Sequence, residues 1–369
     1  MIAVKDVAAD VTSGRTPLRI FRDLVAAERL DHAARLRDIL GRPPLALIAA
    51  FSLKTNPRPE LVKIARERGF FAEAISSQEI AYAERIGFAA SAIIANGPEP
   101  VGDRAEGERL AFVFADGIEA FGRNVRRRVG AVQGVRLRPS MIASRFGVPV
   151  EDDRELCDAV SSAPETVQLG VSFHVRREDF KGAGWRDVAS DVLDRAVALQ
   201  RRTARRVVAF DVGGGWTPDE FEAQFHADMR WLVPRIVDVL PSCTHVIFEP
   251  GQAVCTPAEA LVTRVLEVRE RRGRREAIVD LAYSDWPQMH SYVHGFFIRR
   301  NGAWEPLAKG PDRLGGRTCL EYDLIDGLRF PADLAAGDLL LVTGTGSYDH
   351  SMAFRFAEGA PDGAGSLAR

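Results

Sequence analysis

Cysteine is scarce in this sequence, and it is absent from the spacings that metal clusters and disulfide frameworks use. No C-x-x-C pair occurs, and the four cysteines stand far apart at Cys157, Cys243, Cys255 and Cys319. Neither a zinc cluster nor a set of structural disulfides is therefore predicted. This usage leads us to expect a protein of the reducing cytoplasm.

Long apolar runs and an excess of positive charge are missing as well. No stretch of about 18 apolar residues occurs, which excludes a spanning helix. Residues 1–15 include acidic side chains but no apolar signal region, so a secretory signal is not expected. Lys and Arg number 49 against 51 Asp and Glu. Because nucleic-acid-binding proteins normally carry a basic excess, neither a membrane nor a nucleic acid is an expected partner.

What the sequence does contain is a globular composition with a repeated βα pattern. The chain has 369 residues, 46% hydrophobic and 27% charged, which suits two domains. Eight short apolar runs rich in Val, Ile, Phe or Ala lie at residues 45–51, 70–75, 92–96, 110–116, 131–138, 167–175, 207–212 and 245–250. Such runs are typical of strands buried on both faces, and amphipathic helical stretches separate them. Their number predicts a (β/α)8 barrel, with an open doubly wound sheet as the alternative.

The pattern changes after about residue 256, where strand-like segments and turn signals replace the βα alternation. We therefore expect an α/β barrel over residues 16–255 and a smaller C-terminal β-domain over residues 256–369. Residues 1–15 are expected to join the second domain.

Lys54 is the first candidate for chemistry, because the motif FSLKTNP puts it directly after the first apolar run. In a barrel the carboxyl ends of the strands surround the active site. A lysine desolvated there by Phe51 and Leu53 can form a Schiff base. The alternative is a lysine whose stem lies along the strand end while its charge reaches water.

Other candidate groups end later runs. Three consecutive glycines follow the seventh run and can bring backbone N–H groups close to an anion, or simply form a turn: Gly213, Gly214 and Gly215. Glu249 can pair with a protonated ring nitrogen or cap a helix, and His174 can stack on an aromatic cofactor or be a core histidine. Arg136 is a candidate anchor or a strand-end charge. Together these groups are the set that pyridoxal phosphate needs.

The order of these motifs resembles the fold-type III pyridoxal-phosphate decarboxylases, which include diaminopimelate, ornithine, arginine and lysine decarboxylases. The similarity runs from TPLRIF (16–21) to SMAFRF (351–356). It implies an alanine-racemase-like barrel followed by a β-domain, bound pyridoxal 5'-phosphate, and a homodimer with shared active sites. It makes Lys54 the cofactor lysine, His174 the stacking residue and Glu249 the partner of the pyridine nitrogen, and it assigns the glycines to the phosphate.

Further motifs extend the resemblance. EAISSQEI places Glu73 near the lysine, and SRFG (144–147) resembles a K-F-G stretch of the family. GRTCLEYD resembles the motif whose cysteine acts across the dimer, which is Cys319 here, and GTGSYDHSMA the motif whose tyrosine holds the phosphate, which is Tyr348. The implied activity is removal of the α-carboxylate of an amino acid, with Cys319 returning a proton to the α-carbon.

The sequence departs from the family where the family recognises the far end of its substrates. Leu320 stands where an acid holds a distal amine, and Trp286 where diaminopimelate enzymes carry an arginine. Glu321 and Asp323 are nearby acids that could replace the lost one. The residues after the histidine and the E-P-G motif also differ, at Arg176, Arg177 and Gln252. We assign Arg177, Trp286, Leu320 and Glu321 to substrate recognition, and expect neither diaminopimelate nor ornithine to be the best substrate.

Two other functions are alternatives to this prediction. An amino-acid racemase of the same fold pairs the pyridine nitrogen with arginine and uses a tyrosine base, so Glu249 and Cys319 argue against it. A catalytically silent binding protein would explain the changes at Leu320 and Arg177. The retained lysine, glycines and tyrosine argue against that second alternative.

Overall fold

A computed structural model describes residues 16–40, 45–98, 101–102, 109–176 and 184–356 of the chain. The described chain divides into two compact units. One lies within Ala26–Val254, and the other is formed by the segments on either side of it. None of the helices in the described part is both long and apolar enough to cross a membrane.

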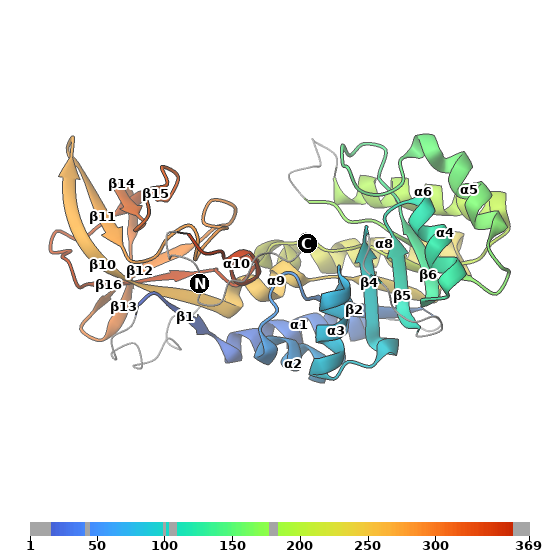
Figure 1. Cartoon of the computed structure of the whole chain (residues 1–369), viewed down its shortest axis with the longest axis horizontal. Helices are drawn as coiled ribbons and strands as arrows, with labels where there is room; N and C mark the ends of the chain where they lie inside the picture. Colours follow the sequence, from blue (N-terminus) through green and yellow to red (C-terminus); the bar gives the residue numbers. More distant parts are fainter. Residues whose placement is uncertain (1–15, 41–44, 99–100, 103–108, 177–183, 357–369) are drawn as a thin grey trace, which may run out of the picture. The chain divides into compact units, whose positions relative to one another are not determined.

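The first unit is a closed barrel of eight parallel strands, in which the last strand pairs with the first. The strands are β2 (Ala46–Ser52), β3 (Phe71–Ala74), β4 (Ile93–Gly97), β5 (Leu110–Ala115), β6 (Gly130–Arg136), β7 (Gln168–Ser172), β8 (Val207–Asp211) and β9 (His245–Phe248). Strands β2, β4, β5 and β6 are labelled in Figure 1. All eight coincide with the predicted apolar runs, so the barrel is confirmed and the open sheet is excluded.

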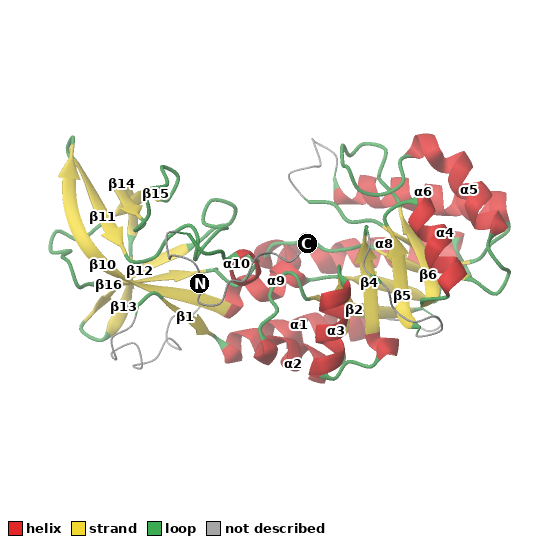
Figure 2. Cartoon of the chain, viewed as in Figure 1, coloured by secondary structure: helices red, strands yellow, loops and turns green. Residues whose placement is uncertain are grey.

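Helices follow most of the strands (Figure 2). They are α1 (Asp23–Leu40), α2 (Pro59–Glu67), α3 (Ser77–Ile86), α4 (Ile118–Arg127), α5 (Asp153–Ser162), α6 (Trp185–Thr203), α7 (Pro218–Glu220), α8 (His226–Val239) and α9 (Gly251–Cys255). Helix α3 shows why these segments fold locally: the Ser76 hydroxyl accepts the Glu79 N–H at its start, and Gly87 ends it at φ 100°.

The barrel interior is filled by side chains rather than open. Phe112 and Phe114 stack in parallel with ring centroids 6.3 Å apart. A Cβ at Gly134 or Gly170 would come within 3 Å of the Phe114 ring, so glycine at both positions makes room for that ring. The packed interior leaves the carboxyl ends of the strands as the place for a site.

The second unit is built on a mostly antiparallel sheet in the order β13-β12-β16-β10-β11-β14-β15. Its strands are β10 (Glu259–Arg271), β11 (Arg274–Val279), β12 (Gly295–Arg300), β13 (Ala303–Pro306), β14 (Ala308–Gly315), β15 (Leu324–Arg329) and β16 (Leu339–Thr343). The short helix α10 (Asp349–Met352) follows the last strand. The predicted β-rich second domain is thus present.

The division of the chain differs from the expected one near its start. Strand β1 (Leu18–Phe21) pairs antiparallel with β10, so residues 16–25 pack with the second unit rather than with the barrel. An extended segment with an unpaired edge gains its hydrogen bonds wherever a strand is available, and apolar pattern alone does not say which sheet supplies it. The expected role of residues 1–15 lies outside the described chain.

Candidate active site

Lys54 lies directly after β2, and its amine is held by an acid from the neighbouring strand. Its Nζ is 2.5 Å from Oε2 of Glu73 in β3 and 2.8 Å from the Ser52 hydroxyl. The same hydroxyl donates to Glu73 at 2.5 Å. Glu73 is almost completely buried, so its charge acts on the ammonium group in a weakly screened environment. The amine is therefore fixed in position at the carboxyl end of the barrel.

Glu249 follows β9 and is a second buried acid at this end. Its Oε1 accepts from Asn96 at 2.7 Å, and its Oε2 lies 3.4 Å from Nδ1 of the half-buried His174. Burial by itself raises the pKa of Glu249, but the His174 contact and the charges of Lys54 and Arg136 outweigh it and lower the pKa. The site thus keeps an ionised carboxylate in its interior.

The glycine loop lies between the ends of β7 and β9. Gly213 and Gly215 have φ values of +65° and +97°, which favour glycine. A Cβ on Gly214 would lie 2.2 Å from the Glu249 carbonyl oxygen, so no side chain fits there. The Gly214 N–H donates to Nδ1 of His174 at 3.2 Å. The loop brings bare backbone close to both the imidazole and the acid.

Arg136 fixes the backbone of His174 and a neighbouring loop. Its guanidinium donates to the His174 carbonyl at 2.7 Å and lies 3.5 Å from Asp116. Asp116 in turn accepts the Gly147 N–H at 3.1 Å. Burial raises the pKa of Asp116 and lowers that of Arg136, and their mutual attraction opposes both shifts. In this arrangement Arg136 is an anchor for protein groups.

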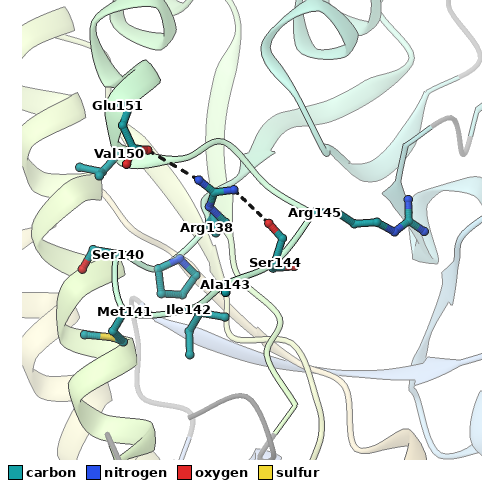
Figure 3. Close-up of a pocket in the computed structure, with 10 residues that line it drawn as sticks. Arg138, Ser140, Met141, Ile142, Ala143, Ser144, Arg145, Val150 and Glu151 are labelled. Carbon is teal, nitrogen blue, oxygen red and sulfur yellow. Dashed lines mark hydrogen bonds and ion pairs between the residues drawn. The ribbon is translucent and has the colours of Figure 1, made fainter. Parts of the chain in front are cut away.

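The loop that contains SRFG borders a separate cavity of about 700 Å³ (Figure 3). Its wall includes Arg138, which donates to the Ser144 carbonyl at 2.9 Å and lies 3.6 Å from Glu151. Figure 3 shows the Arg145 side chain pointing away from the other labelled residues. Neither Lys54 nor Glu249 lines this cavity, so it is not the centre of the site.

Sequence reasoning missed four groups that hold these side chains in place: Ser52, Asn96, Asp116 and Asp211. Each one lies at the end of a barrel strand or next to it in the sequence. That position was the available signal, because polar side chains at the carboxyl ends of parallel strands meet at one edge.

In the second unit, the predicted residues lie on two loops. Cys319 and Glu321 are exposed and Leu320 is half-buried, all between β14 and β15. Tyr348 is half-buried, has φ 64° and precedes α10, with its ring stacked at 6.4 Å from that of Tyr292.

Asp323 holds the Cys319 loop together. Its Oδ1 accepts the Tyr283 N–H at 2.8 Å, and its Oδ2 accepts from the Thr318 hydroxyl at 2.5 Å. The Gly316 N–H also donates to the Asp323 carbonyl at 2.8 Å. Both carboxylate oxygens of this buried residue are therefore occupied by donors of its own loop and of Tyr283.

Trp286, which the sequence analysis assigns to substrate recognition, is a buried residue of the second unit. Its side chain is 1% exposed and belongs to the apolar core of the second unit, which also contains Leu281 and Met289. Its ring packs edge-on against His294 at 4.6 Å. Because indole burial removes a large apolar area from water, the ring is taken up by the core. Of the arginines after His174, Arg176 is exposed and Arg177 lies outside the described residues.

The barrel residues fit pyridoxal phosphate. Gly213–Gly215 form a loop of bare backbone in which an added Cβ would collide with the carbonyl oxygen of Phe173, Glu249 or Val175, and a closely packed glycine loop of this kind suits a phosphate group. A primary amine, an imidazole and a buried carboxylate lie on strand ends around it, at Lys54, His174 and Glu249. These are the groups that bind an aldehyde, a ring face and a ring nitrogen.

Comparison with known proteins gives relatives over most of the chain, although no family model matches it. The lysine/ornithine decarboxylase of Selenomonas ruminantium is 27% identical over 338 residues, covering 83% of this chain and 80% of that protein. The diaminopimelate decarboxylase of Zymomonas mobilis subsp. mobilis is 23% identical over 366 residues, covering 92% and 84%.

Solved structures agree on the fold. The arginine decarboxylase of Paramecium bursaria Chlorella virus bound to agmatine has a TM-score of 0.75 at 18% identity, covering 94% of this chain and 95% of that one. An SrLDC mutant in complex with PLP also has a TM-score of 0.75, at 21% identity, with 96% and 92% covered. The chain therefore resembles the fold-type III pyridoxal-phosphate-dependent amino-acid decarboxylases in sequence and in fold, and the resemblance predicted from its motifs is confirmed.

Proposed function

We propose that this chain is a pyridoxal-phosphate-dependent carboxy-lyase that removes the α-carboxylate of an amino acid or an amino-acid-derived substrate. The linked set of groups at the strand ends carries the proposal: Lys54 on Glu73, and Glu249 beside His174 and the glycine loop. The relatives, which are amino-acid decarboxylases by name, support it. Glu249 favours decarboxylation over the racemase alternative.

Each group has a distinct task. Pyridoxal phosphate, when bound, supplies an electron sink for the electron pair left behind as the carboxylate departs. Lys54 would hold it covalently, and the glycine loop with Tyr348 would hold its phosphate. Glu249, kept ionised by His174, Lys54 and Arg136, would hold a proton on the ring nitrogen. His174, fixed through its carbonyl by Arg136, would lie against the ring.

Glu73 and Ser52 govern the amine of Lys54. At 2.5 and 2.8 Å they orient Nζ before any ligand is bound. Such pre-orientation lowers the entropy cost of bringing amine and substrate together. Loss of Glu73 should therefore weaken turnover more than it weakens folding.

The test of this function is carbon dioxide release against a panel of amino acids by the purified protein loaded with pyridoxal phosphate. Visible absorbance of the lysine-linked cofactor, removed by borohydride, should accompany release. Cofactor binding with racemisation and no carbon dioxide would favour the racemase. Absence of the band together with absence of turnover would favour the silent binding protein.

We further propose a homodimer in which Cys319 of one subunit serves the barrel site of the other. The exposed thiol on a loop that Asp323 holds rigid supports this, since a proton donor must reach its target without disorder. Mixing inactive Lys54→Ala with inactive Cys319→Ala protein should restore activity through hybrid dimers. No recovery after verified subunit exchange would contradict shared sites.

The substrate is proposed to lack a distal ammonium group. Leu320 replaces the acid of the family, Asp323 is occupied by backbone and hydroxyl donors, and Glu321 is exposed. An unpaired ammonium in a closed pocket costs roughly 100-fold in kcat/KM. Steady-state kinetics on ornithine, lysine, arginine and meso-diaminopimelate would decide the matter. A kcat/KM above ~10⁴ M⁻¹s⁻¹ for any of them would contradict the proposal.

A further inference from the structure

Asp211 is the last residue of β8. One of its carboxyl oxygens accepts a hydrogen bond, and the other has no donor among the described residues. Its side chain is 1% exposed. Oδ1 accepts the Gly213 N–H at 2.8 Å and so fixes the start of the glycine loop. Oδ2 is also buried, and no donor among the described residues bonds to it. A carboxylate oxygen in that state loses its hydration without replacement, which is expensive for an anion.

The groups around Asp211 are mainly acidic. Glu249 lies two residues beyond Ile247, which is the register partner of Asp211 on the neighbouring strand β9, and Glu73 on β3 adds a second negative charge. The positive groups, Lys54 and Arg136, act on Glu249 together with His174. Two buried carboxyl groups at the ends of adjacent strands do not both ionise readily, so the pair retains one proton.

The surroundings decide which acid carries that proton. Burial and the charge of Glu249 raise the pKa of Asp211 well above its ordinary value. The pKa of Glu249 is lowered despite its burial, because of His174, Lys54 and Arg136. The two shifts point to the same distribution, with the proton on Asp211.

We propose that Asp211 is a neutral carboxylic acid that donates a hydrogen bond from Oδ2 to Glu249 and thereby keeps Glu249 ionised. Asp211 is then a positioning residue: one oxygen holds the glycine loop, and the other holds the acid that faces the ring nitrogen. The consequence for the ring nitrogen rests on the proposed function, whereas the protonation of Asp211 is independent of that function.

The first test needs no cofactor. Infrared spectra of the cofactor-free protein separate the carbonyl stretch of a protonated carboxyl group from that of a carboxylate. Labelling with ¹³C-aspartate should shift a protonated-carboxyl band, and Asp211→Asn should remove it. Spectra are recorded above the pKa of about 7 of Asp349, so that this residue does not contribute. The matched control is Asp228→Asn, which removes a buried aspartate paired with Arg186 at 2.8 Å and should leave the band.

The proposal would be overturned if the ¹³C-aspartate label did not shift the protonated-carboxyl band, or if the band remained in the Asp211→Asn variant.

The second test measures cofactor affinity. Asn can accept from Gly213 and donate to Glu249 as the neutral acid does, so Asp211→Asn should bind pyridoxal phosphate within about threefold of the native protein. Asp211→Ala removes both bonds and should weaken binding roughly 10- to 100-fold.

An ionised Asp211 would instead make the asparagine variant differ sharply from the native protein in affinity and in the pH dependence of affinity, which would also overturn the proposal. If the infrared result holds while carbon dioxide release fails on every substrate, the proposed function fails and the protonation of Asp211 stands.

Discussion

The strand ends of the barrel and the loops of the second unit carry the predicted site residues in two different ways. In the barrel, Lys54, Glu249, His174 and Arg136 all have bonded partners from other strands. In the second unit, Cys319 and Glu321 are exposed on a loop whose internal bonds run through Asp323. The barrel groups are connected to one another by hydrogen bonds and ion pairs, whereas the side chains of Cys319 and Glu321 are exposed on the surface of their loop.

The difference indicates that the two units have different roles in the proposed site. A connected set of buried charges fixes positions and protonation states within one chain. An exposed thiol on a rigid loop can reach a group on another molecule, which agrees with the proposal that Cys319 serves the barrel site of a partner subunit. The predictions below test this division.

The largest effect is expected from Lys54→Ala. Removing the amine should abolish the borohydride-reducible link and lower turnover by ~10³-fold or more, at least as much as the loss of a positioned acid–base group. Mass mapping of borohydride-fixed cofactor checks the position. Lys63→Ala, on the exposed side of α2, is the control and should behave as the native protein. Fixation on another lysine would disprove the assignment.

Trp286→Ala separates a core role from a substrate role. Since the ring is buried in the second unit, the truncation should lower the free energy of unfolding by about 3–5 kcal/mol, measured by urea denaturation. Trp286→Phe should recover part of the loss. Unchanged unfolding with an altered KM would restore the substrate role that the sequence suggested.

Asp349→Asn tests a buried acid beside Tyr348. Burial raises the pKa of Asp349 from 3.8 to about 7. A raised native pKa favours the protonated form, so this stabilisation is complete below about pH 4 and is lost as pH rises through about 7. The native protein should lose a few kcal/mol over that interval relative to Asp349→Asn. If the free energies of unfolding of the two proteins changed with pH in the same way, this prediction would be contradicted.

Gly214→Ala should have the smallest of these effects on stability, about 1–3 kcal/mol, because its Cβ would overlap the Glu249 carbonyl oxygen. It should also weaken pyridoxal phosphate binding, measured by fluorescence titration. Gly117→Ala is the matched control: nothing lies within 4 Å of a Cβ there, so stability should stay within about 0.5 kcal/mol. Equal effects of the two substitutions would count against the cradle.

The sequence by itself predicted the eight buried strands and the main polar groups that follow them. A strand buried on both faces is a continuous apolar run, and a residue directly after such a run lies at the carboxyl end whatever the rest of the chain does. Lys54, Glu249 and the glycines could be assigned for that reason. Helix starts such as Ser76 are equally local signals.

Only the tertiary structure decided which groups meet and which are buried. Nothing near Asp211 in the sequence indicates that Glu249 is its neighbour, because they come from different strands. Trp286 stands in an irregular segment, and its burial depends on sheet strands far away in the chain. Strand β1 likewise joined the second sheet through pairing with β10. Burial and pairing depend on long-range contacts, which periodicity along the chain does not encode.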